Sequence, residues 1–435
     1  MKLSNYIRTY DIKTDSKILF NTIDKSVVEL EKQYFNNADG LVDNIPNDIY
    51  MALKDMGYFL SDLEAQQIIK NCLEKDDKLI ISVETTLGCN LRCPYCYQGL
   101  TKSAIQLSDE NISLLINYFE LIFKKKPYSE LVLKILGGEP TIVWKKTLSI
   151  IEKAYDFCKK NNIVFHLMLD TNGVIIDDIL SLTKYDSLLL TIPLTHKYCH
   201  DKMRKTANNQ GTYDKIVENI KKIHQTNPDI TIVLRHNTDN DNIILFEEYI
   251  QDLNEKLDFI PLIDISYTTE IGENEFINSL SYKEYKLWKV DKATDILVNH
   301  GFFVMASPLM SMDRCQYRSK YSLKIFHDGT VGPCAMWFFK KDKYYISDII
   351  EDLSIVENFA EKVDVETEKC VNCHSYFICN TSYTLPCIKS LKEMECEEDG
   401  EFNINLESFI KKYMFYNDLG KGDLFVGFTQ AIPIR

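Results

Sequence analysis

Between residues 78 and 267, apolar stretches of strand length alternate with amphipathic stretches of helix length, and this alternation limits the folds open to the chain. A strand, a helix and a further strand favour parallel pairing, because the helix returns the chain to the starting edge of the sheet. The expected strands are KLIISVETT, ELVLKIL, IVFHLML, SLLLTI, DITIVLR and FIPLIDISY. We therefore predict an α/β fold in which residues 78–300 form a partial (β/α)6 TIM-type barrel, with working residues at the carboxyl ends of the strands.

Residues 1–77 precede this alternation and are predicted to form a separate module. YIRTYDIK and KILFNTI alternate as two strands around the turn TDS. Helices are predicted for SVVELEKQYF, NDIYMALKDMGYF and DLEAQQIIKNCLEK. A hairpin with three short helices is similar to a winged-helix module, and nothing in it indicates catalysis. After residue 300 the alternation stops; residues 301–400 are rich in cysteine, and residues 401–435 form a tail with one short helix.

The composition narrows the class of protein. The N-terminus has no apolar segment of signal-peptide length, and no apolar run could span a bilayer, so we expect a cytoplasmic protein without a membrane partner. A net charge of −14 argues against a nucleic-acid partner held through its phosphates. The chain has 13 cysteines, an odd number that disfavours a disulfide scaffold in this compartment. Three of them lie outside any cluster and are predicted to be packing residues: Cys72, Cys158 and Cys199.

Cys89, Cys93 and Cys96 follow the first predicted barrel strand directly. A structural zinc site takes four protein ligands, whereas this loop supplies three cysteines and no histidine. A 4Fe–4S cluster held by three thiolates keeps one iron open to a substrate or cofactor. The vacancy favours the cluster, and zinc is the alternative.

The spacing Cys89-x3-Cys93-x2-Cys96, with the aromatic Tyr95 before the third cysteine, resembles the signature of the radical SAM enzymes. The resemblance implies that the three cysteines are catalytic and hold a 4Fe–4S cluster whose open iron binds S-adenosyl-L-methionine (SAM). One electron from this cluster would then cleave SAM to a 5′-deoxyadenosyl radical, which abstracts hydrogen from an unactivated carbon.

Further segments resemble cofactor-binding elements of the same family. The GGEP element corresponds to Gly137, Gly138 and Glu139, and the TNG turn contains Asn172; alone, the former would be an ordinary strand-to-helix turn. CHDKMR resembles the HDxxR segment, and RHNTDNDN resembles a strand end of the form RxNxxxxN. The family's Ser-x-Asp-Gly element is replaced by TIPLTHK, which keeps a hydroxyl but no acid. The resemblance implies SAM contacts from Tyr95, Gly137, Gly138, Glu139, Asn172, Thr191, Arg204, Arg235 and Asn237, and the two arginines could instead form salt bridges at the barrel rim.

The later cysteines resemble the SPASM extension of this superfamily, except that seven residues rather than three separate Cys379 from Cys387. The family's connectivity implies two auxiliary iron–sulfur clusters. One would be a 4Fe–4S cluster on Cys370, Cys373, Cys379 and Cys396. The other would have three thiolates, and its remaining position could be open, filled by another ligand, or absent in a smaller cluster; its cysteines are Cys315, Cys334 and Cys387. Zinc is the alternative for CVNC.

The resemblance to SPASM enzymes, together with the N-terminal module, implies a peptide maturase. In related enzymes a leader strand of the precursor peptide adds to the edge of such a sheet. We expect an intramolecular cross-link, with a thioether favoured over a carbon–carbon bond because an open auxiliary cluster could capture a cysteine. Partners would be a precursor peptide with its leader and an electron donor such as flavodoxin or ferredoxin. The alternatives are a sulfatase-type maturase, another peptide oxidase or epimerase, and a non-catalytic iron–sulfur electron carrier or scaffold.

Overall fold

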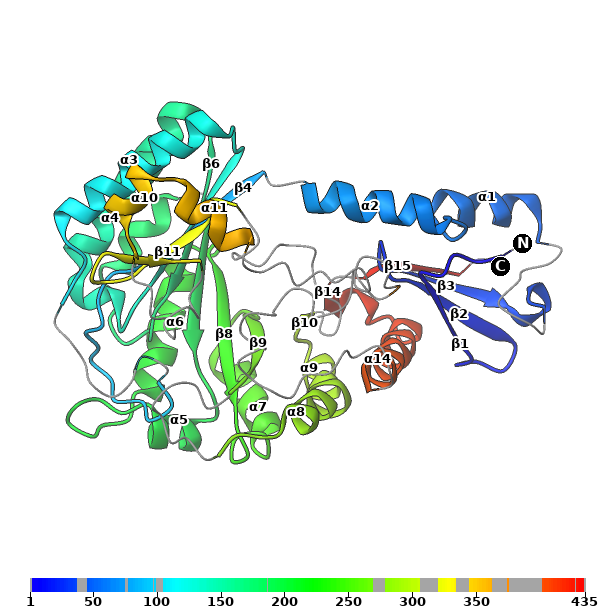
Figure 1. Cartoon of the computed structure of the whole chain (residues 1–435). Helices are drawn as coiled ribbons and strands as arrows, with labels where there is room; N and C mark the ends of the chain where they lie inside the picture. Colours follow the sequence, from blue (N-terminus) through cyan, green and yellow to red (C-terminus); the bar gives the residue numbers. More distant parts are fainter. Residues whose placement is uncertain are drawn as a thin grey trace. The chain divides into compact units, whose positions relative to one another are not determined.

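The structure is a computed structural model in which the chain divides into two compact units (Figure 1). The barrel unit comprises Asp76–Lys289 and Cys315–Val363, and the terminal unit comprises Met1–Lys75, Val290–Arg314 and Asp364–Arg435. The residues described are 2–36, 45–74, 77–96, 98, 105–185, 187–268, 278–305, 320–333, 344–361, 374, 401–426 and 428–433.

The barrel unit is built on parallel strands that pair in chain order. Each strand pairs in parallel with the next, from β4 to β9, so the predicted partial barrel is confirmed. All residues at the carboxyl ends therefore face one rim of the sheet. The strands are β4 (Lys78–Glu84), β5 (Glu130–Leu136), β6 (Val164–Asp170), β7 (Leu188–Pro193), β8 (Thr231–Thr238) and β9 (Leu262–Tyr267).

Helices follow most of these strands, as their apolar periodicity predicts. Helix α3 (Asp109–Lys125) is capped by Ser108, whose hydroxyl accepts a hydrogen bond from the amide of Asn111 at 3.1 Å. The segment after β6 forms only a short 3-10 helix, η3 (Ile179–Lys184). The others are α4 (Trp144–Asn161), α5 (Lys197–Met203), α6 (Tyr213–Thr226), α7 (Phe246–Lys256) and α8 (Tyr282–Trp288).

Three short strands extend the sheet beyond β4 to nine strands, which the sequence did not predict. Strand β11 (Leu323–Ile325) pairs in parallel with β4, and β12 (Thr330–Gly332) and β13 (Tyr344–Tyr345) continue in antiparallel order. The helices α10 (Ile346–Glu351) and α11 (Ser354–Glu361) follow. The cysteine-rich part of the chain therefore contributes directly to the barrel sheet.

The terminal unit contains a sheet of order β1-β2-β3-β15. The first three strands are antiparallel, and β15 (Thr429–Pro433) pairs in parallel with β3. The prediction of a helix over SVVELEKQYF was wrong: residues Ser26–Glu31 form β3, followed by the 3-10 turn η1 (Lys32–Tyr34). The β-branched pair Val27 and Val28 suits a strand, and pairing with β2 supplies the backbone partners. The other strands are β1 (Ile7–Tyr10) and β2 (Ser16–Asn21).

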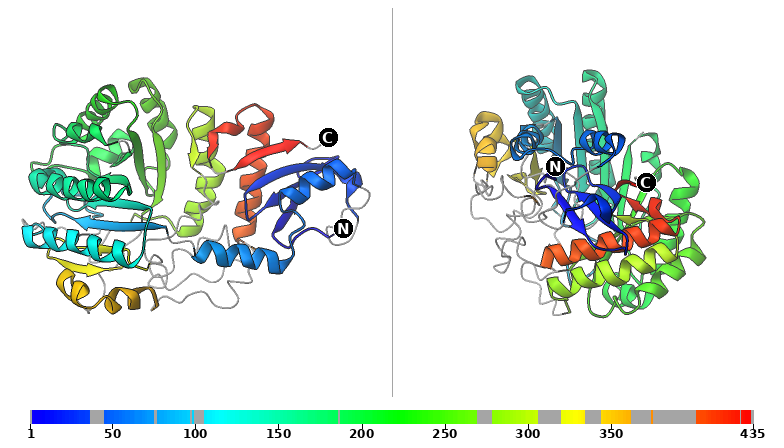
Figure 2. Two further views of the ribbon diagram at one scale, coloured as in Figure 1. Left: turned by 90° about the horizontal axis from the view of Figure 1, so that it is seen from above. Right: turned by 90° about the vertical axis from the view of Figure 1, so that its right-hand side faces the viewer.

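Helices cover this sheet. One face packs against α1 (Asn47–Asp55), with Leu19, Val28 and Leu30 in one buried cluster with Ile49 and Leu53. A second helix, α2 (Asp62–Glu74), follows, so two helices stand where three were predicted. The unit also holds α9 (Thr294–Asn299), α14 (Glu401–Asp418) and the parallel pair β10 (Val304–Met305) and β14 (Phe425–Val426) (Figure 2). The bounds predicted for the four domains stay a prediction.

No helix in the part of the chain that the structure describes has the length and apolar character needed to cross a membrane.

Candidate active site

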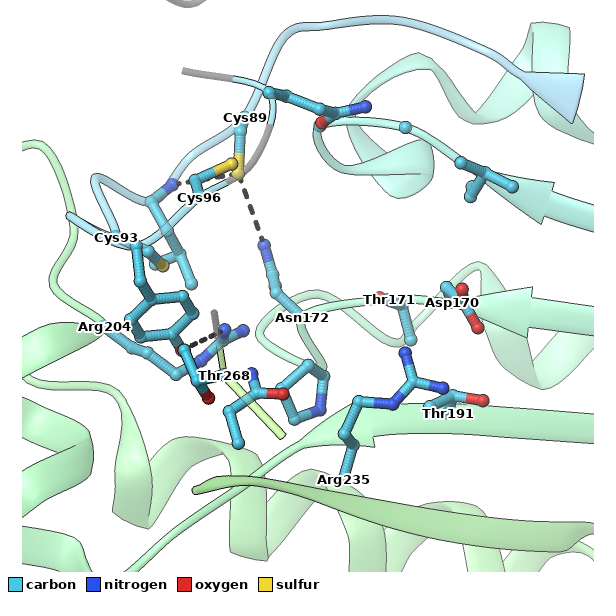
Figure 3. Close-up of a pocket in the computed structure, with 18 of the residues that line it drawn as sticks. Cys89, Cys93, Cys96, Asp170, Thr171, Asn172, Thr191, Arg204, Arg235 and Thr268 are labelled. Atoms are coloured by element: carbon cyan, nitrogen blue, oxygen red, sulfur yellow. Dashed lines mark hydrogen bonds between the residues drawn. The ribbon is translucent and has the colours of Figure 1, made fainter. Parts of the chain in front are cut away.

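A cavity of about 280 Å³ lies at the carboxyl ends of the barrel strands (Figure 3). Its wall brings together nearly every residue of the predicted radical SAM site, although these residues come from six separate loops and strand ends. Glu139 is the exception and does not line it. The predicted residues on the wall are Cys89, Cys93, Cys96, Tyr95, Gly137, Gly138, Asn172, Thr191, Arg204, Arg235 and Asn237.

The cysteine loop follows β4 and forms part of the cavity wall. The amide of Leu91 donates to the sulfur of Cys89 at 3.4 Å, and the amide of Cys96 donates to the carbonyl of Cys93 at 3.2 Å. Among the described residues, no three Cys, His, Asp or Glu side chains converge closely enough to hold one metal ion. In an iron–sulfur cluster each thiolate binds a different iron, and three thiols on this loop suit such a cluster.

The glycines of the GGEP element let the cysteine loop pack against it. The amide of Gly138 donates to the carbonyl of Thr86 at 2.7 Å, and the amide of Glu139 donates to that of Gly88 at 2.8 Å. A Cβ atom on Gly138 would overlap the Gly88 carbonyl, and one on Gly137 would lie 2.6 Å from the Thr86 carbonyl. Because these obstacles are backbone atoms, they cannot move aside as a side chain could. The two glycines therefore allow the backbone of the GGEP element to approach the cysteine loop closely.

The carboxylate of Glu139 joins two loops and is wholly buried. One oxygen accepts from the Thr141 amide at 3.1 Å and from the hydroxyls of Thr141 and Thr171 at 2.8 Å. The other accepts from the Asn172 amide at 2.6 Å. Burial raises the pKa of Glu139, although these donors act in the opposite direction. The side chain thus fixes the turn that carries Asn172, and its predicted direct contact with SAM stays a prediction.

Asn172 points from this turn toward the cysteine loop (Figure 3). Its side-chain amide donates to the Asn90 side-chain oxygen at 2.6 Å and lies 3.9 Å from the sulfur of Cys89. Glu139 therefore supports, through the backbone of Asn172, a residue that contacts the first cysteine.

Arg204 is a buried cation in the cavity wall, 6% exposed. Its Nη1 donates to the hydroxyl of Tyr95 at 3.0 Å (Figure 3). Within the described residues its Nε has no hydrogen-bond partner and no carboxylate forms an ion pair with it. Burial alone would lower the pKa of this guanidinium, but Tyr95 and the thiol of Cys93 raise it above its ordinary value. A buried charge without a carboxylate is costly unless an anion joins it, so the site is suited to an anionic group.

His200 and Asp201 of the HDxxR segment hold Arg204 in place. His200 contacts the Thr212 hydroxyl at 3.1 Å, and that hydroxyl donates to the carbonyl of Arg204 at 2.9 Å. Asp201 accepts from the amides of Thr212 and Tyr213 at 2.7 and 2.9 Å and so begins helix α6. Burial lowers the pKa of His200 well below its ordinary value, so the ring is neutral. The two residues position the arginine and do not line the cavity.

Arg235 differs from Arg204 because it has a carboxylate partner. Its Nε donates to Asp264 at 2.9 Å. Burial opposes ionisation of Asp264, but the charge of Arg235 keeps the pKa of Asp264 below its ordinary value. The salt bridge that the sequence left open is present for this arginine. On the same strand end, Asn242 donates to the carbonyl of Asn237 at 2.8 Å and fixes the RxNxxxxN turn.

Asp170 was not predicted as a site residue, yet it lines the cavity beside Thr191, its neighbour in the sheet. Lys134 pairs with one of its oxygens at 3.2 Å, and the other is buried without a partner among the described residues. Its position directly before the TNG turn is the sequence feature that could have predicted it. The acid missing from TIPLTHK therefore has a counterpart on the adjacent strand.

Glu84 is the centre of a second group that sequence reasoning missed. It ends β4 and accepts from Lys324 at 3.1 Å, from His327 at 2.6 Å, and from Gln98, which lines the cavity, at 2.8 Å. Burial would raise the pKa of Glu84, but His327 and Lys324 hold it below its ordinary value. No local pattern reveals this group, because β4 and β11 are far apart in sequence.

The seven cysteines predicted to bind the auxiliary clusters lie outside the described residues: Cys315, Cys334, Cys370, Cys373, Cys379, Cys387 and Cys396. Their ligand roles stay predictions.

Comparison with known proteins shows what this part of the chain is similar to. Residues 83–248 match the family model of the radical SAM superfamily. These residues form a radical SAM domain. Its three cysteines, its GGEP loop and both arginines fall within the matched range.

Similarity to individual proteins extends beyond the radical SAM domain. A "cysteine-type anaerobic sulfatase-maturating enzyme" of Clostridium novyi (strain NT) is 27% identical over 361 residues, which are 77% of this chain and 93% of the relative. The solved structure "Native anSMEcpe with bound AdoMet" has a TM-score of 0.57 at 18% identity and covers 79% of this chain and 99% of its own. The same protein solved "with bound AdoMet and Cp18Cys peptide" has a TM-score of 0.55 at 18% identity, covering 80% and 99%. At this identity the solved structures show a shared fold.

The residues of the site fit the cofactors of a radical SAM domain. Three thiols lie on one wall, and the same cavity is faced by a buried guanidinium that has no carboxylate partner among the described residues. Thiolates suit iron–sulfur clusters, and a guanidinium suits a carboxylate.

Proposed function

We propose that this chain is a radical SAM/SPASM peptide maturase that installs an intramolecular cross-link in a precursor peptide. The observation that carries the SAM-dependent part is the buried Arg204, which has no carboxylate partner among the described residues and faces the cavity that holds the three cysteines. A small anionic cofactor would complete this arrangement, because it neutralises a charge that is otherwise buried at a cost.

Each wall residue has a proposed part in holding the cofactors. Cys89, Cys93 and Cys96 would hold a 4Fe–4S cluster, and Arg204 would receive the SAM carboxylate. When bound, a reduced cluster and SAM would supply a 5′-deoxyadenosyl radical able to remove hydrogen from an unactivated carbon. Contacts to the remainder of SAM are proposed from Tyr95, Gly137, Gly138, Glu139, Asn172, Thr191, Arg235 and Asn237.

A peptide substrate is supported by the relative from Clostridium novyi, whose name describes maturation of a sulfatase, and by the small sheet of the terminal unit. Sheet edges accept extended peptides through backbone hydrogen bonds. We propose a leader-bearing precursor, with a thioether favoured over a carbon–carbon bond. The proposal includes two auxiliary clusters, a flavodoxin or ferredoxin as electron donor and a cytoplasmic location.

Sulfatase-type maturation is the second candidate. The match to the relative covers 93% of that enzyme, so the shared region is nearly all of it. Cp18Cys, the peptide in the solved neighbour, is the probe that separates the two candidates. Oxidation of its cysteine by this chain would support sulfatase-type maturation, whereas an unmodified peptide under conditions that cleave SAM favours the cross-linking proposal.

The core of the proposal is tested by SAM cleavage. The chain is reconstituted anaerobically with iron and sulfide, and mixed with SAM and dithionite. Release of 5′-deoxyadenosine is expected from the wild type and from Cys158→Ala, because Cys158 is a buried packing residue of α4. Cys89→Ala should lose iron and release none. If the fully loaded wild type releases none, the chain is better described as an electron carrier or scaffold.

A further inference from the structure

The sheet of the terminal unit already carries an added strand from its own chain. Strand β15 pairs in parallel with β3, so the order is β1-β2-β3-β15 (Figure 1). An extended peptide that added to β3 would need the same backbone groups. The chain's own strand and a partner peptide therefore compete for one edge.

The pairing of β15 with β3 is irregular. Thr429 pairs with Ser26 and Ile432 with Val28, so three steps along β15 match two steps along β3, and the register shifts between them. Pro433, opposite Glu29, has no amide hydrogen to donate. A bulge and a proline both weaken a ladder, and parallel pairing is slightly less stable per residue than antiparallel pairing. The neighbouring β2–β3 pair, by contrast, runs without interruption over Phe20 to Ser16.

The segment just before β15 is firmly packed. The ring of Phe428 stacks on Tyr413 of α14, with centroids 4.0 Å apart and planes at 9°, and it also contacts Phe20 of β2. Lys13 forms an ion pair with Asp418, the last residue of α14, at 2.9 Å. Helix α14 and Phe428 can thus stay in place while residues 429–433 leave the edge.

The β3 edge also has a helical neighbour. Tyr58, which is fully buried between α1 and α2, donates to the carbonyl of Ser26 at 3.2 Å and contacts its hydroxyl at 3.1 Å. Ser26 is the β3 residue opposite Thr429. A strand at this edge therefore begins beside the turn that joins α1 and α2.

We propose that β15 is an internal occupant of the peptide-docking edge and that the extended leader of a precursor displaces it from β3. The proposal rests on the proposed function for the identity of the peptide. When no peptide is bound, β15 protects the edge of β3 from pairing with other chains. A peptide can bind only those molecules in which the edge is open, so its apparent affinity falls in proportion to that fraction.

Hydrogen exchange on the full, reconstituted chain tests whether β15 opens. Amides of residues 429–432 should exchange at least about tenfold faster than those of β2 and α14, because their opening is local. Exchange as slow as that of β2 would overturn the proposal.

Peptide capture tests the competition. The probe is the fluorescein-labelled peptide FTQAIPIR, which is residues 428–435, and a scrambled peptide is the control. A chain ending at Phe428 should bind the probe at least about tenfold more tightly than the full chain does. The affinity of Ile432→Pro for the probe should lie between those of the full and shortened chains. Leu419→Ser changes an exposed residue near the C-terminus and should bind the probe as the full chain does. Equal capture by the full and shortened chains, including none by either, would overturn the proposal.

The two hypotheses fail in different ways. If β15 is not displaced by peptides, the same preparations should still release 5′-deoxyadenosine. If instead the proposed function is wrong, no 5′-deoxyadenosine is released, but the hydrogen-exchange and peptide-capture results are unaffected.

Discussion

The guanidinium of Arg204 donates a hydrogen bond to the hydroxyl of Tyr95 at 3.0 Å, although 109 residues separate them in the chain. Tyr95 lies between two cysteines of the cluster motif, so this bond joins the cysteine loop to the segment after β7. A neutral hydroxyl orients the arginine without neutralising it. The positive charge remains available to an anion in the cavity.

This arrangement predicts different outcomes for the two arginines. Arg204→Gln should weaken SAM binding by about 10- to 100-fold, because a charge-assisted contact contributes about 1.5–3 kcal/mol. Arg235→Gln should weaken SAM binding less and lower stability more, because Arg235 is already paired with Asp264 and its loss leaves that carboxylate without its partner. Calorimetric titration with SAM and unfolding by urea, at equal iron content, measure the two effects. Equal loss of SAM affinity in both variants would contradict the assignment.

The packing of Gly138 on the cysteine loop predicts a steric effect on cluster loading. Gly138→Ala places a methyl group on the carbonyl of Gly88 and should reduce iron content after reconstitution, with a loss of stability of about 2 kcal/mol or more. The control is Gly301→Asn, since nothing lies within 4 Å of a Cβ there and Asn tolerates its positive φ. Iron analysis should show normal loading for the control alone.

Because four donors bond to the carboxylate of Glu139, we predict that its charge stabilises the folded chain. Glu139→Gln keeps the shape but directs an amide group at a donor, so a buried N–H or O–H loses its acceptor, at a cost of about 1–3 kcal/mol. The matched change Glu152→Gln affects an exposed pair with Lys184 and should cost at most about 0.5 kcal/mol. Urea unfolding compares them, and an equal, small effect would argue against a clamp.

The Glu84 group predicts a pH-dependent stability. Because the pKa of Glu84 is lowered in the folded state, its contribution is present above the ordinary value of 4.5 and is lost as the pH falls through the folded value. Lys324→Met removes a buried cation, should cost about 3 kcal/mol near neutral pH, and should move the loss to higher pH. Adding Glu84→Gln to that variant should recover part of the stability and flatten the pH profile. Unfolding of the iron-free chain is measured across about pH 2–7, which includes the range below 4.5 where the contribution of Glu84 is lost. A pH profile unchanged by Lys324→Met would contradict a role for the pair.

Local periodicity was sufficient to predict the strands and helices of the barrel, because each of them buries an apolar face that its own sequence encodes. It failed at residues 26–35, where apolar residues alternating with glutamates fit a helix as well as a strand. The choice of a strand came from pairing with β2 and β15, and β15 lies about 400 residues further along the chain.

By itself the sequence determined the parallel barrel and the three cysteines at its rim, because strand order and motif spacing are local properties. Only the tertiary structure decided which arginine is paired, that Glu139 clamps two loops, and that Glu84, Lys324 and His327 form one buried group. Those outcomes depend on which strand ends meet, and a charge is held or left available by neighbours that the chain brings together only when it folds.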